Sequence, residues 1–308
     1  MELKAYFPEV KRSYFPIFDS DWISIQDGEE YLHFPISSLT KRELILLEVL
    51  AHKNSPAEKH RSAWHAYLVD GKGDVPEELS AYQFIYFNHQ EQLSQEFSDV
   101  LSSIIGTVID HIAISQTRTA FLIDNQTKTD NFATLIDILP TLENDFGQAF
   151  RVFIGNEWPK DSLAPISAYF KEENNLFSSY LADKRSHQVV SFPELMLWSL
   201  IAVIPLKTVE AHFNHCLIQN KDMSDMVVAM WQSQGNLVQS AQKLYIHRNS
   251  LQYKLDKLKV QSGLNLKNLD DLAFAYLFIE KNKDCARCPK KFGRFVYVMK
   301  TLSLIYYS

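Results

Sequence analysis

The stretch "GNLVQSAQKLYIHRNSLQYKLDKL", residues 235–258, decides how the C-terminal part of this chain folds. Gly235 suits the left-handed end of one helix, and Asn236 is a favoured N-cap for the next. The pair Tyr245-Ile246 marks a short turn, after which three leucines recur at i, i+4 and i+7: Leu251, Leu255 and Leu258. The pattern predicts short helices joined by tight turns, which is the layout of a helix-turn-helix.

The same stretch concentrates positive charge in an acidic chain. The 308 residues carry a formal net charge of −6, yet this region and its next residue place five basic side chains against Asp256 alone: Lys243, Arg248, Lys254, Lys257 and Lys259. A local basic stripe on an acidic protein indicates a polyanionic partner. On a helical wheel, Asn249, Tyr253 and Lys257 lie opposite Leu251, so the polar face points away from the apolar one.

We therefore predict double-stranded DNA as the partner, because the major groove admits a helix whose first residues reach base edges. Arg248 can bond guanine through two atoms and Asn249 can pair with adenine, whereas the lysines suit phosphates. Tyr253 suits a thymine methyl or a phosphate, and its alternative role is a rim residue between helices. The predicted contacts are His247, Arg248, Asn249, Ser250, Gln252, Tyr253, Lys254 and Lys257. The alternative for the whole segment is a solvated basic face.

The remaining chain predicts an α+β multidomain protein. Residues 1–95 form an N-terminal α/β region and possible sensor, with "WISI" and "EYLHFPI" as strands around an Asp27-Gly28 turn and capped helices after Thr40 and Ser55. Residues 96–205 alternate strands and helices in an α+β domain, residues 215–281 hold the all-α helix-turn-helix, and residues 282–308 are a basic tail.

Composition limits the location and the cofactors. The N-terminus lacks the pattern of a signal peptide, and the apolar run 196–206 is shorter than the ~20 residues of a membrane span, so we predict a cytoplasmic protein with no membrane contact. Cys285 and Cys288 form a single C-x-x-C without a second ligand pair, and we predict no metal and no cofactor.

Catalysis is a second hypothesis, placed in the middle domain. Asp110, His111 and Asp124 near predicted strand ends are imaginable acid or base groups, although such residues are more often solvated caps. The chain has no P-loop, G-x-G-x-x-G, H-E-x-x-H or G-x-S-x-G motif. We therefore predict that the protein is not an enzyme.

The quoted stretch resembles the C-terminal helix-turn-helix of PucR/CdaR-type bacterial regulators, the purine-catabolism and sugar-diacid regulator group, and the helix-turn-helix is similar to the Fis type. "SGLNLKNLDDLAFAYLFIE" is similar to the sequel of that domain, and the resemblance covers about residues 222–280. Residues that match the pattern are Gly235, Asn236, Leu237, Ala241, Leu244, Ile246, His247, Arg248, Asn249, Ser250, Leu251, Tyr253, Lys254 and Leu255.

The resemblance implies a DNA-binding transcriptional regulator, acting as a homodimer or a higher homo-oligomer. Residues 96–200 more weakly resemble a degenerate GGDEF-like domain, but the chain has no Gly-Gly dipeptide, so cyclase activity is not expected. The N-terminal and middle domains would sense an unknown small-molecule or protein effector or mediate oligomerisation. A third hypothesis is a protein-interaction module that no longer binds DNA, and burial of Arg248 and Lys254 against another domain would favour it.

Overall fold

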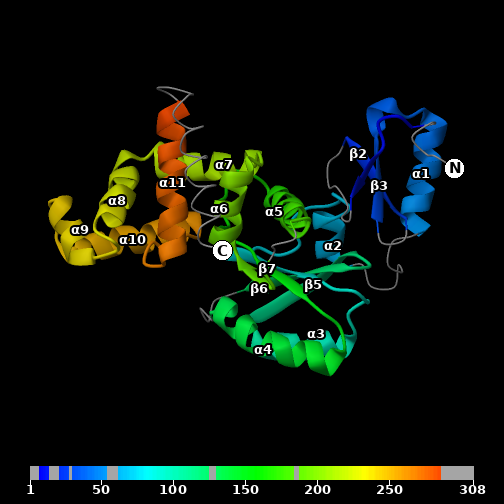
Figure 1. Cartoon of the computed structure of the whole chain (residues 1–308), viewed down its shortest axis with the longest axis horizontal. Coiled ribbons are helices and arrows are strands. Elements are labelled where there is room, and N and C mark those ends of the chain that lie inside the picture. Colours follow the sequence, from blue (N-terminus) through cyan, green and yellow to red (C-terminus); the bar gives the residue numbers. More distant parts are fainter. Residues whose placement is uncertain are drawn as a thin grey trace. The chain divides into compact units, whose positions relative to one another are not determined.

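The structure, a computed structural model, describes residues 7–13, 21–27, 30–53, 62–124, 130–183 and 187–285. It divides into two compact units, each assembled from separate chain segments (Figure 1). Unit 1 consists of Met1–Glu78, Phe84–Ile154 and Phe170–Val189. Unit 2 consists of Leu79–Gln83, Gly155–Tyr169 and Val190–Ser308. The predicted class, a multidomain α+β protein with a helical C-terminal region, is confirmed.

The first part of unit 1 is a three-stranded antiparallel sheet in the order β1-β3-β2. Its elements are β1 (Lys11–Ser13), β2 (Trp22–Asp27), β3 (Glu30–Pro35), the 3-10 turn η2 (Ile36–Ser38), α1 (Lys41–Lys53) and α2 (Ala63–Leu68). The predicted hairpin is present, with Asp27 opposite Glu30, so Asp27 belongs to the strand and not to the turn. Thr40 and Glu43 form the predicted capping box. The predicted cap at Ser55 lies outside the described residues, and α2 is capped instead by Ser62, whose Oγ accepts a hydrogen bond from the backbone nitrogen of His65 at 3.0 Å.

The larger sheet has the strand order β5-β6-β4-β7-β9, with β8 paired to β4. Its first part follows the β-α-β-β-α-β order of ferredoxin-like folds. The elements are β4 (Ala81–Asn88), α3 (Gln95–Ile104), β5 (Thr107–Ser115), β6 (Arg118–Asp124), α4 (Asn131–Phe146), β7 (Arg151–Ile154), β8 (Trp158–Pro159), α5 (Ile166–Leu181) and β9 (Val189–Ser191). In unit 1, α3 and α4 cover one face, and Phe170 and Phe177 of α5 pack on the other through Tyr86 and Phe153.

The central strand β4 was missed by the sequence analysis and precedes the predicted start of the middle domain at residue 96. Six of its eight residues are buried, so "AYQFIYFN" has no alternation of polar and apolar positions. Strands covered on both faces lose the period-2 signal on which sequence-based recognition depends. The predicted alternation of strands and helices over residues 96–205 is confirmed, and α4 ends at Gly147, which has φ 65°.

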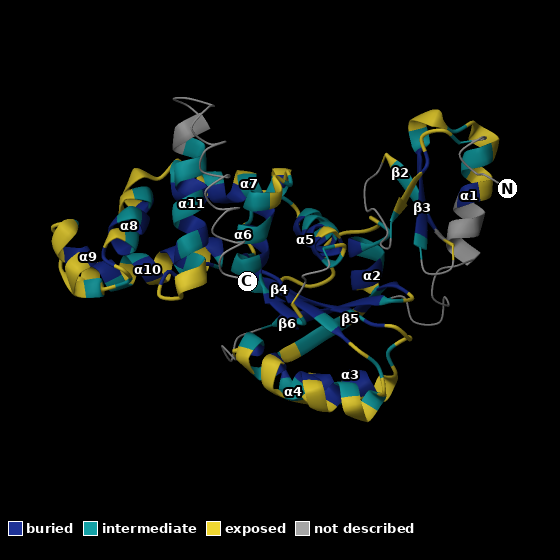
Figure 2. Ribbon diagram, viewed as in Figure 1, coloured by how far each residue is buried: buried dark blue, intermediate teal, exposed yellow. Residues whose placement is uncertain are grey.

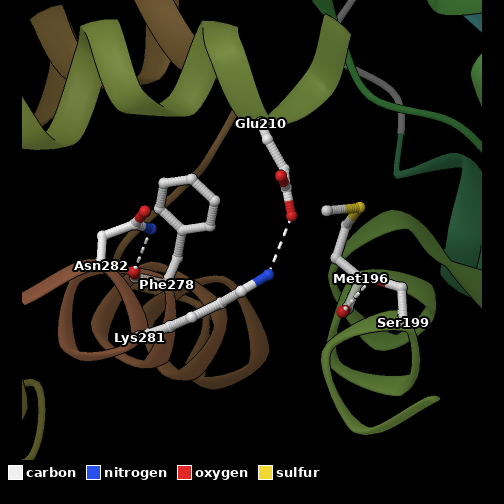
Figure 3. Close-up of polar contacts among 6 residues, drawn as sticks. All are labelled: Met196, Ser199, Glu210, Phe278, Lys281 and Asn282. Carbon is white, nitrogen blue, oxygen red and sulfur yellow. Dashed lines mark hydrogen bonds and ion pairs between the residues drawn. The ribbon is translucent and has the colours of Figure 1, made fainter. Parts of the chain in front are cut away.

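Unit 2 is mainly helical. Its helices are α6 (Phe192–Ala202), α7 (Lys207–Phe213), the π-helical turn η4 (Asn214–Ile218), α8 (Lys221–Gln232), α9 (Leu237–Lys243), α10 (Arg248–Ser262) and α11 (Leu269–Cys285). Phe213 of α7 packs edge-on against Phe274 and Phe278 of α11, with ring centroids 5.1 and 5.9 Å away. Lys281 Nζ crosses from α11 to Glu210 Oε1 of α7 at 2.9 Å (Figure 3). Aromatic packing and this ion pair therefore hold α7 against α11.

Burial along the helices of unit 2 follows the apolar stripes of the sequence. The inner faces of α8, α10 and α11 are buried, whereas the outer faces of α9 and α10 are exposed (Figure 2). Among the described residues, no single helix is long and apolar enough to cross a membrane, and one sharply bent pair, Phe192–Ala202 with Lys207–Ile218, meets that test by length and composition.

Candidate nucleic-acid interface

The first turn of the helix-turn-helix is shaped by backbone conformation. Gln234 and Gly235 after α8 have φ of 51° and 77°, and a glycine takes such angles without the steric penalty of a side chain. Asn236 Oδ1 then accepts hydrogen bonds from the backbone nitrogens of Val238 and Gln239 at 3.0 and 3.2 Å. The predicted Gly-Asn break and N-cap are confirmed.

The second turn places the start of α10. Tyr245 has φ 53° and its side chain is 95% exposed, an unusual conformation for a bulky residue. His247 is the N-cap of α10, and its Nδ1 accepts a hydrogen bond from Asn249 N at 3.2 Å. The imidazole therefore supports the first turn of the helix that we predicted to enter DNA.

The core beneath α10 is apolar. Leu251, Leu255 and Leu258 are at most 4% exposed, and Ala241 of α9 is 3% exposed where the two helices approach. Burying a leucine side chain contributes roughly 1.5–3 kcal/mol. The three leucines thus fix the rotation of α10 about its axis, which in turn directs the polar residues outward.

Five of the eight predicted DNA contacts have side chains that make no hydrogen bond or ion pair within the described part of the chain: Arg248, Asn249, Ser250, Tyr253 and Lys257. All five residues are exposed, and Tyr253 is 72% exposed. This arrangement leaves guanidinium, amide, hydroxyl and ammonium groups available to another molecule.

The other three predicted contacts have partners within the chain. His247 caps α10, Gln252 Nε2 donates to Asp256 Oδ1 at 2.7 Å, and Lys254 Nζ lies 3.1 Å from Asp222 Oδ2 at the start of α8. Lys243, the basic residue of α9, donates to Gln232 O at 3.1 Å. These groups are held in defined positions before any partner arrives.

A groove of about 490 Å³ runs between the start of α8 and the polar face of α10. Five predicted DNA contacts line its α10 side: Asn249, Ser250, Tyr253, Lys254 and Lys257. The opposite wall consists of Asn220, Asp222 and Met223, which were not predicted as site residues from the sequence. These residues read as an ordinary helix start, and only the fold brings them to α10.

The far end of α10 is anchored to a distant segment of unit 2. Asn156 Nδ2 donates to Ser262 O at 2.8 Å, and Asn156 is 4% exposed. Gly263 follows with φ 79°, and a Cβ at this position would lie 2.6 Å from Asn156 Cγ and 2.7 Å from Nδ2. A glycine is thus required here both by conformation and by space.

A second cavity of unit 2, about 680 Å³, shares Asn220 and Asp222 with the groove and includes His212 and Cys216. Burial lowers the pKa of His212 to about 4 and raises the pKa of the Cys216 thiol to about 11. Both groups are therefore neutral at pH 7. Among the described residues no three His, Cys, Asp or Glu side chains are placed to hold a metal, and Cys288 lies outside those residues.

The acid and base candidates of the catalytic hypothesis do not line either cavity. Asp110 and His111 lie on β5, where Asp110 Oδ1 accepts a hydrogen bond from the backbone nitrogen of His111 at 2.8 Å. Asp124 ends β6 opposite Thr107. The structure does not bring these three residues to a common cavity among the two described.

Comparison with known proteins assigns the helical region to a family. Residues 225–279 match the family model of the PucR C-terminal helix-turn-helix domain. The "Leucine-rich protein" of Streptococcus dysgalactiae subsp. equisimilis is 43% identical over 281 residues, which cover 91% of this chain and all of that protein. "Uncharacterized protein YxkF" of Bacillus subtilis (strain 168) is 20% identical over 271 residues, covering 84% of this chain and 90% of that one.

A solved structure is also similar to this chain. It is a regulator of polyketide synthase expression from Bifidobacterium adolescentis, with a TM-score of 0.34 and 11% sequence identity. The similarity covers 80% of this chain and 89% of that chain.

Proposed function

We infer that this chain, which belongs to the same family as the streptococcal leucine-rich protein and carries a PucR-type helix-turn-helix domain, is a DNA-binding transcriptional regulator. The observation that carries the inference is the exposed face of α10. Five polar or basic side chains project there without partners in the described chain, while the leucines of the same helix are buried. A helix that is buried on one face and exposes polar and basic groups on the other suits the major groove.

The side chains of α10 would contact DNA in two ways, some at base edges and others at phosphates. Arg248 and Asn249 stand at the N-terminal end of the helix, where helix-turn-helix proteins contact base edges, so they would supply sequence preference. Lys257, and Lys254 once it is released from Asp222, would contact phosphates and supply affinity that depends on salt. Arg248 is exposed, and Lys254 pairs with Asp222 of the same unit, which supports DNA binding over the alternative of a protein-interaction module.

Further roles are assigned to the rest of the chain as part of the same proposal. A homodimer would place two copies of α10 in successive major grooves, about 34 Å apart. Residues 1–95 and the GGDEF-like residues 96–205 would sense an effector or mediate oligomerisation, without cyclase or other enzymatic activity. The regulator would work in the cytoplasm.

The proposal is tested by selection from genomic DNA. Purified full-length protein is mixed with sheared fragments of the source genome, and the retained fragments are sequenced. One enriched motif is the expected result, and a variant with both Arg248→Ala and Lys257→Ala should lose the enrichment because it lacks the base and phosphate contacts. Retention of the same fragments by this variant, or no enrichment by the parent, would contradict the proposal.

A further inference from the structure

An ion pair between Lys254 and Asp222 lies in the groove beside α10, at the place where another anion would bind Lys254. Lys254 Nζ lies 3.1 Å from Asp222 Oδ2, and the two side chains are 34% and 74% exposed. Lys257 lines the same groove, so two ammonium groups face one carboxylate. The groove therefore keeps a net positive charge while one of its cations is already engaged.

A carboxylate oxygen and a phosphodiester oxygen present the same chemistry to a lysine, an anionic acceptor at hydrogen-bonding distance. We propose that this groove receives a backbone phosphate of DNA, and that Asp222 is an intramolecular competitor which engages Lys254 until a phosphate displaces it. The inference rests on the proposed DNA-binding function and adds Asp222 to the residues that govern it.

The competitor acts on affinity and not on sequence preference. Displacing Asp222 involves only the phosphate backbone, which is the same for every DNA sequence. Arg248 and Asn249, which are directed at bases in the proposed complex, make no hydrogen bond or ion pair with Asp222 among the described residues. Asp222 therefore lowers the affinity for an operator and for random DNA by the same factor.

The test compares two neutralised aspartates of one helix. Asp222→Asn and Asp225→Asn each remove one negative charge from α8, and Asp225 is exposed and has no ion pair within the described chain. Fluorescence anisotropy with a labelled random-sequence duplex is measured for full-length protein between about 50 and 200 mM salt. Asp222→Asn should tighten binding about two- to fivefold at the lowest salt, as expected for an exposed ion pair.

The ratio of operator to random affinity and a Lys254→Ala background supply two further readouts. Asp222→Asn frees Lys254 before binding, so it should remove the competition and leave the ratio of operator to random affinity unchanged. In a Lys254→Ala background the gain from Asp222→Asn should fall to that of Asp225→Asn, because the competition then has no target and only the loss of one long-range charge remains. Asp225→Asn should produce a smaller gain that persists in that background, since it acts only through long-range charge.

The outcomes separate this inference from the proposed function. If Asp222→Asn and Asp225→Asn give equal affinities while the parent binds DNA, the competitor role is wrong and the regulator assignment stands. A gain from Asp222→Asn that stays above that of Asp225→Asn in the Lys254→Ala background also overturns the competitor role. If the parent and all variants, each with an unchanged circular-dichroism melt, bind no DNA at any salt concentration, both the inference and the proposed function fail.

Discussion

Replacing Gly263 with alanine tests the anchoring of the recognition helix. Gly263 has φ 79°, and its missing Cβ would lie within 2.7 Å of Asn156 Cγ and Nδ2, closer than real Cβ contacts allow. Gly235, in the same unit, has φ 77° but nothing within 4 Å of its missing Cβ. The two glycines share the conformational requirement and differ only in the space around them, which makes Gly235→Ala a matched control.

The expected magnitudes follow from that difference. A left-handed alanine costs about 1–2 kcal/mol relative to glycine at either position. At Gly263 the Asn156 side chain must also move, so its hydrogen bond to Ser262 O is lost in a buried site, which costs about 1–3 kcal/mol more. Gly263→Ala should therefore lower the free energy of unfolding by about 2–5 kcal/mol, against about 1–2 kcal/mol for Gly235→Ala.

The assay is urea unfolding followed by far-ultraviolet circular dichroism. Because both glycines lie in unit 2, the two variants report on the same region of the protein. A second comparison uses an Asn156→Ala background, which removes the colliding atoms, and there the excess loss at Gly263 should disappear. Equal losses for Gly263→Ala and Gly235→Ala in the parent background would refute the close-approach argument.

Three other predictions concern the helical region. Arg248→Ala should cost about 1–3 kcal/mol in operator binding and relax discrimination at one base pair, whereas Lys257→Ala should weaken binding to all sequences alike; competition titrations with operator and random duplexes distinguish them. Leu251→Asp should unfold the helix-turn-helix, seen as lost ellipticity at 222 nm, because it buries a charge at a position that is 0% exposed. Burial lowers the pKa of His212 to about 4, below the usual 6.5, so the unfolded chain takes up that proton first and stability is lost as the pH falls from 6.5 toward 4. His212→Gln should reduce the loss between pH 7 and 4.5 by on the order of 2 kcal/mol in urea titrations, and an unchanged loss would contradict this assignment.

The parts of the fold that sequence patterns predicted are those with local periodicity. Leu251, Leu255 and Leu258 recur at helical spacing, and the structure buries all three. Gly235 and Asn236 define a turn by local chemistry alone, a left-handed glycine followed by a side-chain N-cap, and that turn is present. Strand β4 was missed because burial on both faces removes the alternation that marks a strand.

The parts of the candidate site that could not be predicted depend on contacts between distant residues. Lys254 was identified as a phosphate contact, but its partner Asp222 lies 32 residues earlier in the chain. Asn156 lies 106 residues before Ser262, the residue to which it donates. No local pattern encodes either pairing, because each depends on how the helices pack after they have formed.

Unit 2 is assembled from three chain segments, and this limits how evolution or an experimenter can move its DNA-binding part. Asn156 and Trp158 belong to Gly155–Tyr169, far before the helix-turn-helix, and Trp158 packs edge-on against His212 with ring centroids 5.2 Å apart. A gene segment cut out at residues 215–281 leaves both behind, and with them the donor to Ser262 O. Recombination that moves only this segment therefore transfers α10 without the Asn156 hydrogen bond that anchors its end. Changing the exposed side chains of α10 within the intact chain is the way to alter sequence preference while keeping that support.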